Sequence, residues 1–264
     1  MKHASYIRGL AVTRDGTKII CSDGDGEIKV WDVKSHEIVK QWTHSEGYPD
    51  IAISPDDRLL AVGGKTVTFY TMEGRQVNHS IKVDGYVHSL CFSPNGKKLA
   101  CCTSDDIRVY DVDSGTLLSE SQQDLVKCVL WSPDGSRLFS GGLDDKTIRC
   151  WHSDTGEQIG HPWTCHTSFI LSLSLSPDGL ILASASSDKT VRFWDATTGH
   201  PIGHLQHDYP VHTVRFSPSG EFVVSGGWDE KIYLWRVPWL NSVENRVRAL
   251  TRWTSVFILI ALSI

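Results

Sequence analysis

Two stretches of the sequence carry a histidine, a serine, an aspartate and a tryptophan at matching positions. The two sets are His166, Ser184, Asp188 and Trp194, and His207, Ser225, Asp229 and Trp235. Histidine, serine and aspartate together could form a hydrolase triad, in which the histidine is the base for a serine nucleophile. The repetition argues against this chemistry, because a catalytic triad needs to occur only once. The Gly-x-Ser-x-Gly turn that presents a nucleophilic serine in many hydrolases is also absent from the sequence.

Histidines and acidic residues also raise the question of a metal site. His200, His204, His207 and His212 lie close together in the sequence and could bind zinc. Exposed histidines in turns and at strand edges are the simpler interpretation. The acidic run at 23–27 resembles part of a calcium-binding loop, but it lacks the length and the distal glutamate. We therefore expect no metal and no other cofactor.

The elements that position these residues follow from an internal repeat. Ser-Pro-Asp-Gly or a near copy begins at six positions, and an aromatic residue follows each one 16 to 19 residues later. The six starts are Thr13, Ser54, Ser93, Ser132, Ser176 and Ser217, and the six aromatics are Trp31, Tyr70, Tyr110, Trp151, Trp194 and Trp235. A period of about 41 residues indicates one supersecondary unit that is copied along the chain.

One copy of the repeat, residues 165–205, shows what each unit builds. Short apolar runs at 170–175, 180–184 and 190–195 are separated by turns rich in Ser, Pro, Asp and Gly, and 202–205 can form a fourth strand. No segment before Trp235 sustains helical periodicity. Each repeat therefore predicts a four-stranded antiparallel sheet, and the chain is predicted to be all-β. Because one such sheet cannot bury both faces alone, the repeats are expected to stack radially as a propeller.

The repeats resemble those of the WD-repeat family. Trp31-Asp32 and Trp194-Asp195 are the dipeptide that names the family, Tyr110-Asp111 is a common variant, and the second repeat is the weakest match. The resemblance covers residues 3–237. It implies a WD-repeat β-propeller of six four-stranded blades; an incomplete or fragmentary seven-bladed ring stays an alternative. The expected repeats span about 3–42, 43–81, 82–121, 122–163, 164–205 and 206–237, all within one domain.

The same resemblance implies a structural role for the two sets of residues. In the family, a histidine, a hydroxyl residue, an aspartate and the tryptophan form a hydrogen-bonded tetrad within one blade. Two repeats have the complete tetrad, and repeat one has His3, Asp25 and Trp31, with Cys21 in place of the hydroxyl. A buried carboxylate beside an imidazole offsets its loss of hydration, and the indole N–H and the hydroxyl find partners.

Composition limits the classes of partner. The net charge is −5 and no run of Lys or Arg exceeds two residues, so nucleic-acid binding is not expected. The seven cysteines include no Cys-x-x-Cys pair and the N-terminus has no apolar signal region, which predicts an intracellular protein with reduced thiols. We expect a cytoplasmic location, with the nucleus as an alternative.

The tail at 238–264 does not follow the repeat. It is polar to basic at 241–252 and mostly apolar at 253–264. It could supply the fourth strand of the sixth blade, form a helical or disordered extension, or anchor the protein to a membrane. The apolar run is shorter than the roughly 20 residues that span a bilayer, so a membrane partner is not expected.

Function is predicted to lie on the face of the propeller, here called the top, that carries the segments leading into the first strands. Aromatic residues recur there, and we expect them to anchor a protein partner: Trp228, Tyr209, Phe169, Tyr6, Tyr48 and Tyr86. Packing between blades beneath the loops is the alternative role for these side chains. The predicted function is a non-catalytic scaffold or sensor module that binds proteins, without a small-molecule substrate. The alternative is an enzyme or small-ligand binder that uses the central channel, but first strands such as 171–175 offer hydroxyls and no carboxylate or imidazole.

Overall fold

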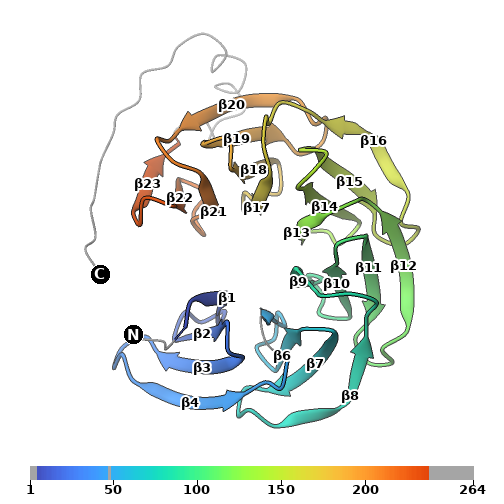
Figure 1. Ribbon diagram of the computed structural model, residues 1–264, viewed down its shortest axis with the longest axis vertical. Coiled ribbons are helices and arrows are strands. Elements are labelled where there is room, and N and C mark those ends of the chain that lie inside the picture. Colours follow the sequence, from blue (N-terminus) through green and yellow to red (C-terminus); the bar gives the residue numbers. More distant parts are fainter. Residues whose placement is uncertain (1–4, 47–48, 238–264) are drawn as a thin grey trace. The chain divides into compact units, whose positions relative to one another are not determined.

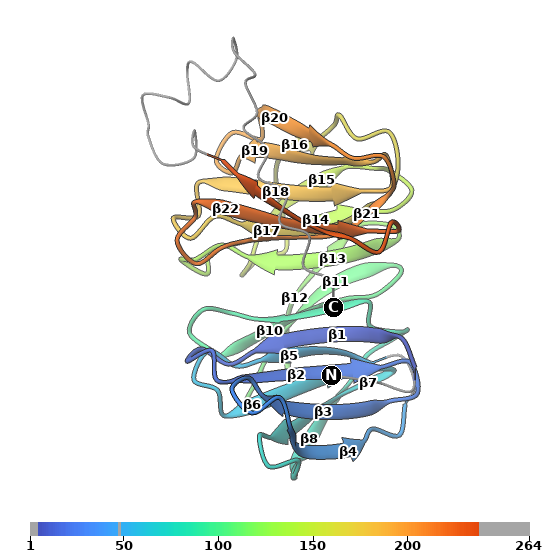
Figure 2. The same ribbon diagram turned by 90° about the vertical axis from the view of Figure 1, so that its left-hand side faces the viewer.

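A computed structural model describes residues 5–46 and 49–237 (Figures 1 and 2). These residues form six antiparallel sheets and contain no helix, so the fold class is an all-β propeller built from blades. His3, Tyr48 and the tail at 238–264 lie outside the described residues, and the expectations for them stay predictions.

Each of the first five blades has four strands in chain order. Blade 1 contains β1 (Ile7–Val12), β2 (Lys18–Asp23), β3 (Glu27–Asp32) and β4 (Ile38–Thr43). Blade 2 contains β5 (Asp50–Ile53), β6 (Leu59–Gly63), β7 (Thr66–Thr71) and β8 (Gln76–Lys82). Blade 3 contains β9 (Ser89–Phe92), β10 (Lys98–Cys102), β11 (Asp106–Asp111) and β12 (Leu117–Gln122). Blade 4 contains β13 (Val126–Trp131), β14 (Arg137–Gly142), β15 (Ile148–His152) and β16 (Gln158–Trp163).

Blade 5 contains β17 (Ile170–Leu175), β18 (Ile181–Ser186), β19 (Thr190–Asp195) and β20 (Pro201–Gln206). Blade 6 has three strands within the described residues: β21 (Val211–Phe216), β22 (Phe222–Gly227) and β23 (Ile232–Arg236). The expectation of six four-stranded blades is therefore met by five of them, and the described part of the sixth ends after its third strand.

The repeated motifs form the turns between these strands. In blade 5 the Ser176 hydroxyl accepts the Ile181 N–H at 2.9 Å and donates to the Asp178 carboxylate at 2.5 Å. The Asp195 carboxylate accepts the N–H groups of Thr197 and Thr198 at 2.9 and 2.8 Å. The aspartate of the Trp-Asp dipeptide thus caps the turn that leads to the fourth strand, which explains why this turn recurs with that residue.

Compactness divides the chain into two units. Unit 1 comprises residues 1–131 and 152–157, and unit 2 comprises residues 132–151 and 158–264. Blades 1 to 3 belong to unit 1, where β1 contacts β5 and β5 contacts β9 (Figure 1). Blades 5 and 6 belong to unit 2, where β17 contacts β21. The first strands of successive blades therefore lie side by side within each unit.

The core of each unit lies between its blades. In unit 1, Phe69 of blade 2 packs with Leu90 and Phe92 of blade 3. In unit 2, Phe193 of blade 5 packs with Val211 and Val214 of blade 6. Each blade has an apolar face toward each neighbour because side chains alternate between the two faces of a strand.

Candidate functional site

Blade 5 brings its histidine, serine, aspartate and tryptophan together as one chain of hydrogen bonds. The Trp194 indole N–H donates to the Ser184 hydroxyl at 2.8 Å, and Ser184 lies 2.7 Å from His166 Nε2. His166 Nδ1 lies 2.7 Å from the Asp188 carboxylate. Because an ionised carboxylate can only accept, Nδ1 carries the proton and Nε2 accepts from the serine. Every polar group of the set has a partner in the right role.

The electrostatics of blade 5 favour a neutral histidine beside a charged aspartate. Burial lowers the pKa of His166, and the bond to Asp188 offsets only part of that effect. Burial opposes ionisation of Asp188, but hydrogen bonds from His166, Thr190 and the Thr167 N–H hold its pKa well below the usual range. Ser184 is fully buried and tied to Trp194, so its hydroxyl is not an accessible nucleophile. The arrangement is suited to holding β17, β18 and β19 together rather than to hydrolysis.

Blade 6 keeps the contacts among histidine, serine and tryptophan, but its aspartate has a different hydrogen-bond partner. Ser225 accepts the Trp235 indole N–H at 2.8 Å and lies 3.2 Å from His207 Nε2. The Asp229 carboxylate instead accepts the Tyr233 hydroxyl. The ring of Tyr233 lies edge-on to His207 with centroids 4.9 Å apart. Asp229 therefore does not take the place that Asp188 has in blade 5, although the sequence spacing is the same.

Blade 1 also departs from the expected set. The Trp31 indole N–H donates to the Cys21 sulfur at 3.2 Å, so the thiol takes the place of the serine hydroxyl. Asp25 is exposed. The buried acid in this turn is Asp23, which accepts the N–H groups of Asp25 and Glu27 at 3.1 and 2.9 Å. The placement expected for Asp25 is thus corrected, since the carboxylate that satisfies this turn comes two residues earlier.

Three of the predicted partner-binding aromatics lie in unit 2 and are exposed. Trp228, Tyr209 and Phe169 have exposed fractions of 69%, 55% and 44%. The Trp228 N–H donates to the Pro210 carbonyl at 3.2 Å, and Phe169 makes the equivalent backbone contact with Ser187 in blade 5. Because β17 and β21 contact each other, these aromatics lie at the same end of two neighbouring first strands. The Trp228 ring stacks on His212, which lies on β21 of the same blade, with centroids 5.8 Å apart.

Tyr6 and Tyr86 belong to unit 1 and are also exposed, at 57% and 52%. The Tyr6 carbonyl accepts the Gly24 N–H at 3.0 Å, which is the backbone contact that Pro210 makes with Trp228 in blade 6. The Lys65 ammonium lies 5.2 Å from the centroid of the Tyr86 ring. Unit 1 thus presents two aromatic residues at the start of its first strands, one of them paired with a cation.

Titratable groups on the first strands of unit 1 correct the expectation that these strands offer mostly hydroxyls. Arg8 is on β1, Asp50 begins β5, His88 precedes β9 and Lys127 is on β13. An alignment of the repeats would have found three of them, because Arg8, His88 and Lys127 all stand five residues before the start of the Ser-Pro turn. In blade 5 the same position is held by Leu171, which is apolar.

These four groups influence one another. Burial raises the pKa of Asp50 to about 6, although its carboxylate accepts the Leu90 N–H at 2.9 Å. Burial and the charge of Arg8 lower the pKa of Lys127, and burial together with both cations lowers the pKa of His88. The Arg8 Nε atom is buried and has no hydrogen-bond partner among the described residues. The two cations, Arg8 and Lys127, thus lie close enough to influence each other and the Asp50 carboxyl.

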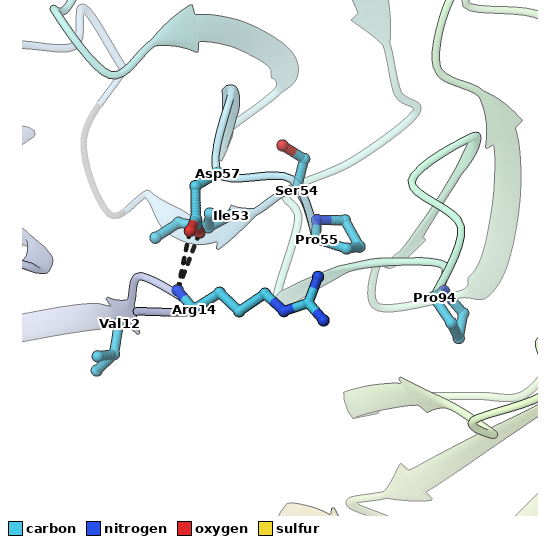
Figure 3. Close-up of a pocket in the computed structure, with 7 residues that line it drawn as sticks. All are labelled: Val12, Arg14, Ile53, Ser54, Pro55, Asp57 and Pro94. Atoms are coloured by element: carbon cyan, nitrogen blue, oxygen red, sulfur yellow. Dashed lines mark hydrogen bonds between the residues drawn. The ribbon is translucent and has the colours of Figure 1, made fainter. Parts of the chain in front are cut away.

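A depression of about 370 Å³ lies at the turns between the first and second strands of unit 1 (Figure 3). Its lining comprises Val12, Arg14, Ile53, Ser54, Pro55, Asp57 and Pro94. The Arg14 side chain extends toward Pro94, and the Arg14 N–H donates to both oxygens of Asp57 at 3.1 and 3.0 Å. The single acid in the lining is engaged with the backbone, so this depression lacks an acid–base pair.

In the part of the chain that the structure describes, no group of three or more histidine, cysteine, aspartate or glutamate side chains is arranged to hold a metal ion. Over residues 5–46 and 49–237 no helix has the length and apolar character needed to cross a membrane.

Comparison with known families identifies the class of protein. The family described as "WD domain, G-beta repeat" matches residues 1–32, 75–111, 114–152, 156–195 and 199–236. The chain therefore belongs to the WD-repeat family of β-propeller proteins. The unmatched stretch at 33–74 includes most of the second repeat, which also departs most from the motif in its own residues.

Curated relatives share the repeat region. The chain is 28% identical to Protein groucho of Drosophila melanogaster over 92% of this chain and 35% of groucho. It is 27% identical to Transcription factor unc-37 of Caenorhabditis elegans over 90% of this chain and 41% of that protein. Small ribosomal subunit protein RACK1y of Oryza sativa subsp. japonica is 32% identical over 50% of this chain and 43% of RACK1y. The chain thus spans less than half the length of these relatives.

Proposed function

We propose that this chain is a non-catalytic protein-interaction scaffold whose partner docks on an aromatic rim of unit 2 formed by Trp228, Tyr209 and Phe169. The observation that carries the proposal is the exposure of Trp228, 69%, in a turn where the equivalent residue of blade 5 is Ser187. An exposed indole contributes little to folding of the blade. A partner that buries it can gain about 2 kcal/mol or more of binding free energy.

The geometry of the rim supports a preformed site. Stacking on His212 restricts the Trp228 ring before any partner arrives, which lowers the entropy lost on binding. Tyr209 and Phe169 add flat aromatic surface at the start of the first strands of blades 6 and 5. Tyr6 and Tyr86 form the corresponding candidates in unit 1, and Tyr48 remains a sequence-based candidate.

The relatives are consistent with a scaffold inside the cell. One is named as a transcription factor and another as a small ribosomal subunit protein, and each is similar to this chain through its repeats. We place the protein in the cytoplasm, with the nucleus as the alternative. Imaging of a fluorescent fusion in the source organism would distinguish these compartments.

The experiment compares Trp228→Ala with Leu180→Ala. Leu180 is also an exposed apolar residue, but it directly follows the Ser-Pro-Asp-Gly turn of blade 5. It therefore precedes β18, whereas Ser187, the blade 5 counterpart of Trp228, follows the opposite end of that strand. Partners recovered by the wild-type chain and identified by mass spectrometry should be lost with Trp228→Ala and kept with Leu180→Ala. Thermal unfolding should be nearly unchanged in both variants. Intact recovery with a large loss of stability in Trp228→Ala would instead assign the indole to blade packing.

A second candidate function is the binding of a small anion at the first strands of unit 1. The unpartnered Arg8 Nε and the partly buried Lys127 motivate it, because desolvated cations favour an oxyanion ligand. Titration calorimetry with inorganic phosphate at low ionic strength should give binding that is lost in Lys127→Met. Lys97→Met, which removes an exposed lysine from a turn, is the matched control for net charge. Equal binding by both variants would remove this candidate.

A further inference from the structure

The turn between β6 and β7 of blade 2 lacks the aspartate that blades 4, 5 and 6 place there. Gly64 holds the position of Asp188 in blade 5, six residues before the aromatic of the repeat. The Asp188 carboxylate accepts the Thr190 N–H at 3.0 Å and the Thr190 hydroxyl at 2.6 Å. Blade 2 keeps the counterpart of this threonine, Thr66, four residues before its aromatic. The donors of Thr66 therefore need an acceptor that Gly64 cannot supply.

Glu46, in the segment that leads into β5, supplies this acceptor. Its Oε2 accepts the Thr66 N–H at 3.0 Å and also the Lys65 N–H, and its Oε1 accepts the Thr66 hydroxyl at 2.5 Å. Burial opposes ionisation of the carboxyl, but these hydrogen bonds hold the pKa of Glu46 below its ordinary value. Glu46 thus makes the two threonine contacts that Asp188 makes in blade 5, although it comes from a different segment of the chain.

The absence of a side chain at residue 64 makes room for this contact. A Cβ added to Gly64 would lie against Glu46 Oε2 and 2.8 Å from Glu46 Cβ, so the two side chains compete for one place. The φ angle of Gly64 is not in the positive range, so other residues can adopt its backbone conformation. The Glu46 side chain, rather than the backbone of the turn, therefore accounts for the glycine.

The same turn binds the segment at 83–88 that leads into β9 of blade 3. The Gly64 carbonyl accepts the Val87 N–H at 3.0 Å, and the Lys65 carbonyl accepts the Val83 N–H at 3.3 Å. Tyr86 lies between these two valines in the sequence, and the Lys65 ammonium lies 5.2 Å from the centroid of its ring. The backbone that Glu46 binds therefore also binds the segment that carries Tyr86.

We propose that Glu46 is a positioning residue that takes the place of the missing turn aspartate of blade 2 and holds Lys65 against Tyr86. All of these residues belong to unit 1. An aromatic ring that is held in place before a partner binds loses less entropy on binding, which suits Tyr86 as a docking residue. Only this last step rests on the proposed function, because the contacts of Glu46 need no partner.

Amide hydrogen exchange measured by NMR on the full chain tests the role of Glu46. Glu46→Ala should make the Lys65 and Thr66 amides exchange about tenfold faster or more, because each loses a hydrogen bond to a charged group. Gly64→Asp in the Glu46→Ala background should restore slow exchange at Thr66, since the introduced carboxylate can accept from it. Gly64→Ala in the same background should not, because it adds a Cβ without an acceptor. Glu37→Ala, which removes an exposed glutamate from blade 1, is the control for charge and should leave both amides unchanged.

Two further variants keep the test decisive. Glu46→Gln keeps the size of the side chain and should accelerate exchange less than Glu46→Ala, so it carries the test if the alanine variant does not fold. Gly64→Asp alone should unfold at a lower temperature than the wild type, because the two side chains then compete for one place. Unchanged exchange in both Glu46 variants would overturn the proposal. Equal recovery with Gly64→Asp and Gly64→Ala would also overturn it.

The ring of Tyr86 reports whether the effect reaches the docking surface. Its ring proton shifts should move in Glu46→Ala and return when Gly64→Asp is added. Shifts that stay at their wild-type values would overturn the positioning role of Glu46 toward this ring. Partner recovery that survives Tyr86→Ala would instead remove only the docking role of Tyr86, since the exchange of Thr66 is measured without a partner.

Discussion

Replacing Asp188 by alanine should destabilise the protein far more than the same change at Asp229, although the two residues hold the same position in consecutive repeats. Asp188 accepts hydrogen bonds from His166 Nδ1 at 2.7 Å, the Thr190 hydroxyl at 2.6 Å and the N–H groups of Thr190 and Thr167 at 3.0 and 3.1 Å. The side chains of His166 and Asp188 are 0% and 4% exposed. Truncation leaves these donors without an acceptor in a site that water barely reaches.

The magnitude follows from the number of orphaned donors. Leaving a buried donor unsatisfied costs about 1–3 kcal/mol, and breaking a buried charged pair costs about 3–5 kcal/mol. We expect Asp188→Ala to lose about 3 kcal/mol or more. Asp229 accepts from Tyr233 and from the Lys231 N–H at 3.3 Å in a partly exposed turn, so its loss should be about 1 kcal/mol or less.

The assay is urea unfolding of both variants, followed by circular dichroism and tryptophan fluorescence. Asp188→Asn adds a test of charge. Because the folded-state pKa of Asp188 lies below its unfolded value, its contribution is present above about pH 4 and is lost as the pH falls further. The difference between wild type and Asp188→Asn should therefore shrink in acid. Equal losses for the two alanine variants, or a larger loss at Asp229, would refute the reasoning.

Three further changes test other parts of the structure. Asp50→Asn should stabilise the protein by about 3 kcal/mol at pH 8 and have almost no effect at pH 4 in urea unfolding, because a pKa raised from 3.8 to about 6 means that the ionised Asp50 carboxylate opposes folding. A variant that is no more stable at pH 8 would show that ionising this carboxyl in the folded protein costs nothing. Cys21→Ser should change stability by less than about 1 kcal/mol, since a hydroxyl can accept the same indole N–H; a larger loss in thermal unfolding would mean that the thiol is needed for packing. Gly199→Ala should cost more than Gly160→Ala in calorimetry, because both residues have φ near +70° but an added Cβ at Gly199 would lie 2.2 Å from the Trp163 indole while Gly160 has open space. Equal costs would mean that the Trp163 ring moves freely.

Much of the fold could be predicted from sequence because the motifs that form the turns are local and recur in each repeat. The Ser-Pro turn at Ser176 and the Trp-Asp turn at Asp195 are closed by their own side chains within a few residues. Such turns set strand length and order, and strands of this length with alternating side chains must stack to bury their faces. Six copies made the pattern visible even where the second repeat is weak.

The polar sets show where spacing stops being enough. His166 and His207 have the same sequence relation to their aspartates, yet only Asp188 reaches its histidine. Tyr233 stands where blade 5 has Arg192, and its hydroxyl takes the Asp229 carboxylate. In blade 1 Asp23 rather than Asp25 is buried, and it accepts the N–H groups of Asp25 and Glu27. Which donor forms a hydrogen bond to a carboxylate depends on the side chains of neighbouring strands. Residue spacing along the chain does not determine those neighbours.

The sequence by itself determined the repeat, the strand order within each blade, the turn chemistry and the exposed aromatic residues at the start of the first strands. Only the tertiary structure decided which apolar faces are covered and which charged groups meet. Leu10 and Leu90 read alike in their repeats, but Leu10 is 62% exposed, whereas Leu90 packs with Phe69 of blade 2 and is 6% exposed. Arg8, Asp50 and Lys127 lie more than 40 residues apart in sequence and influence one another only because β1, β5, β9 and β13 lie side by side in unit 1. Burial and charge interactions depend on distance in space, whereas turns and strands depend on distance along the chain. The sequence directly gives only the distance along the chain.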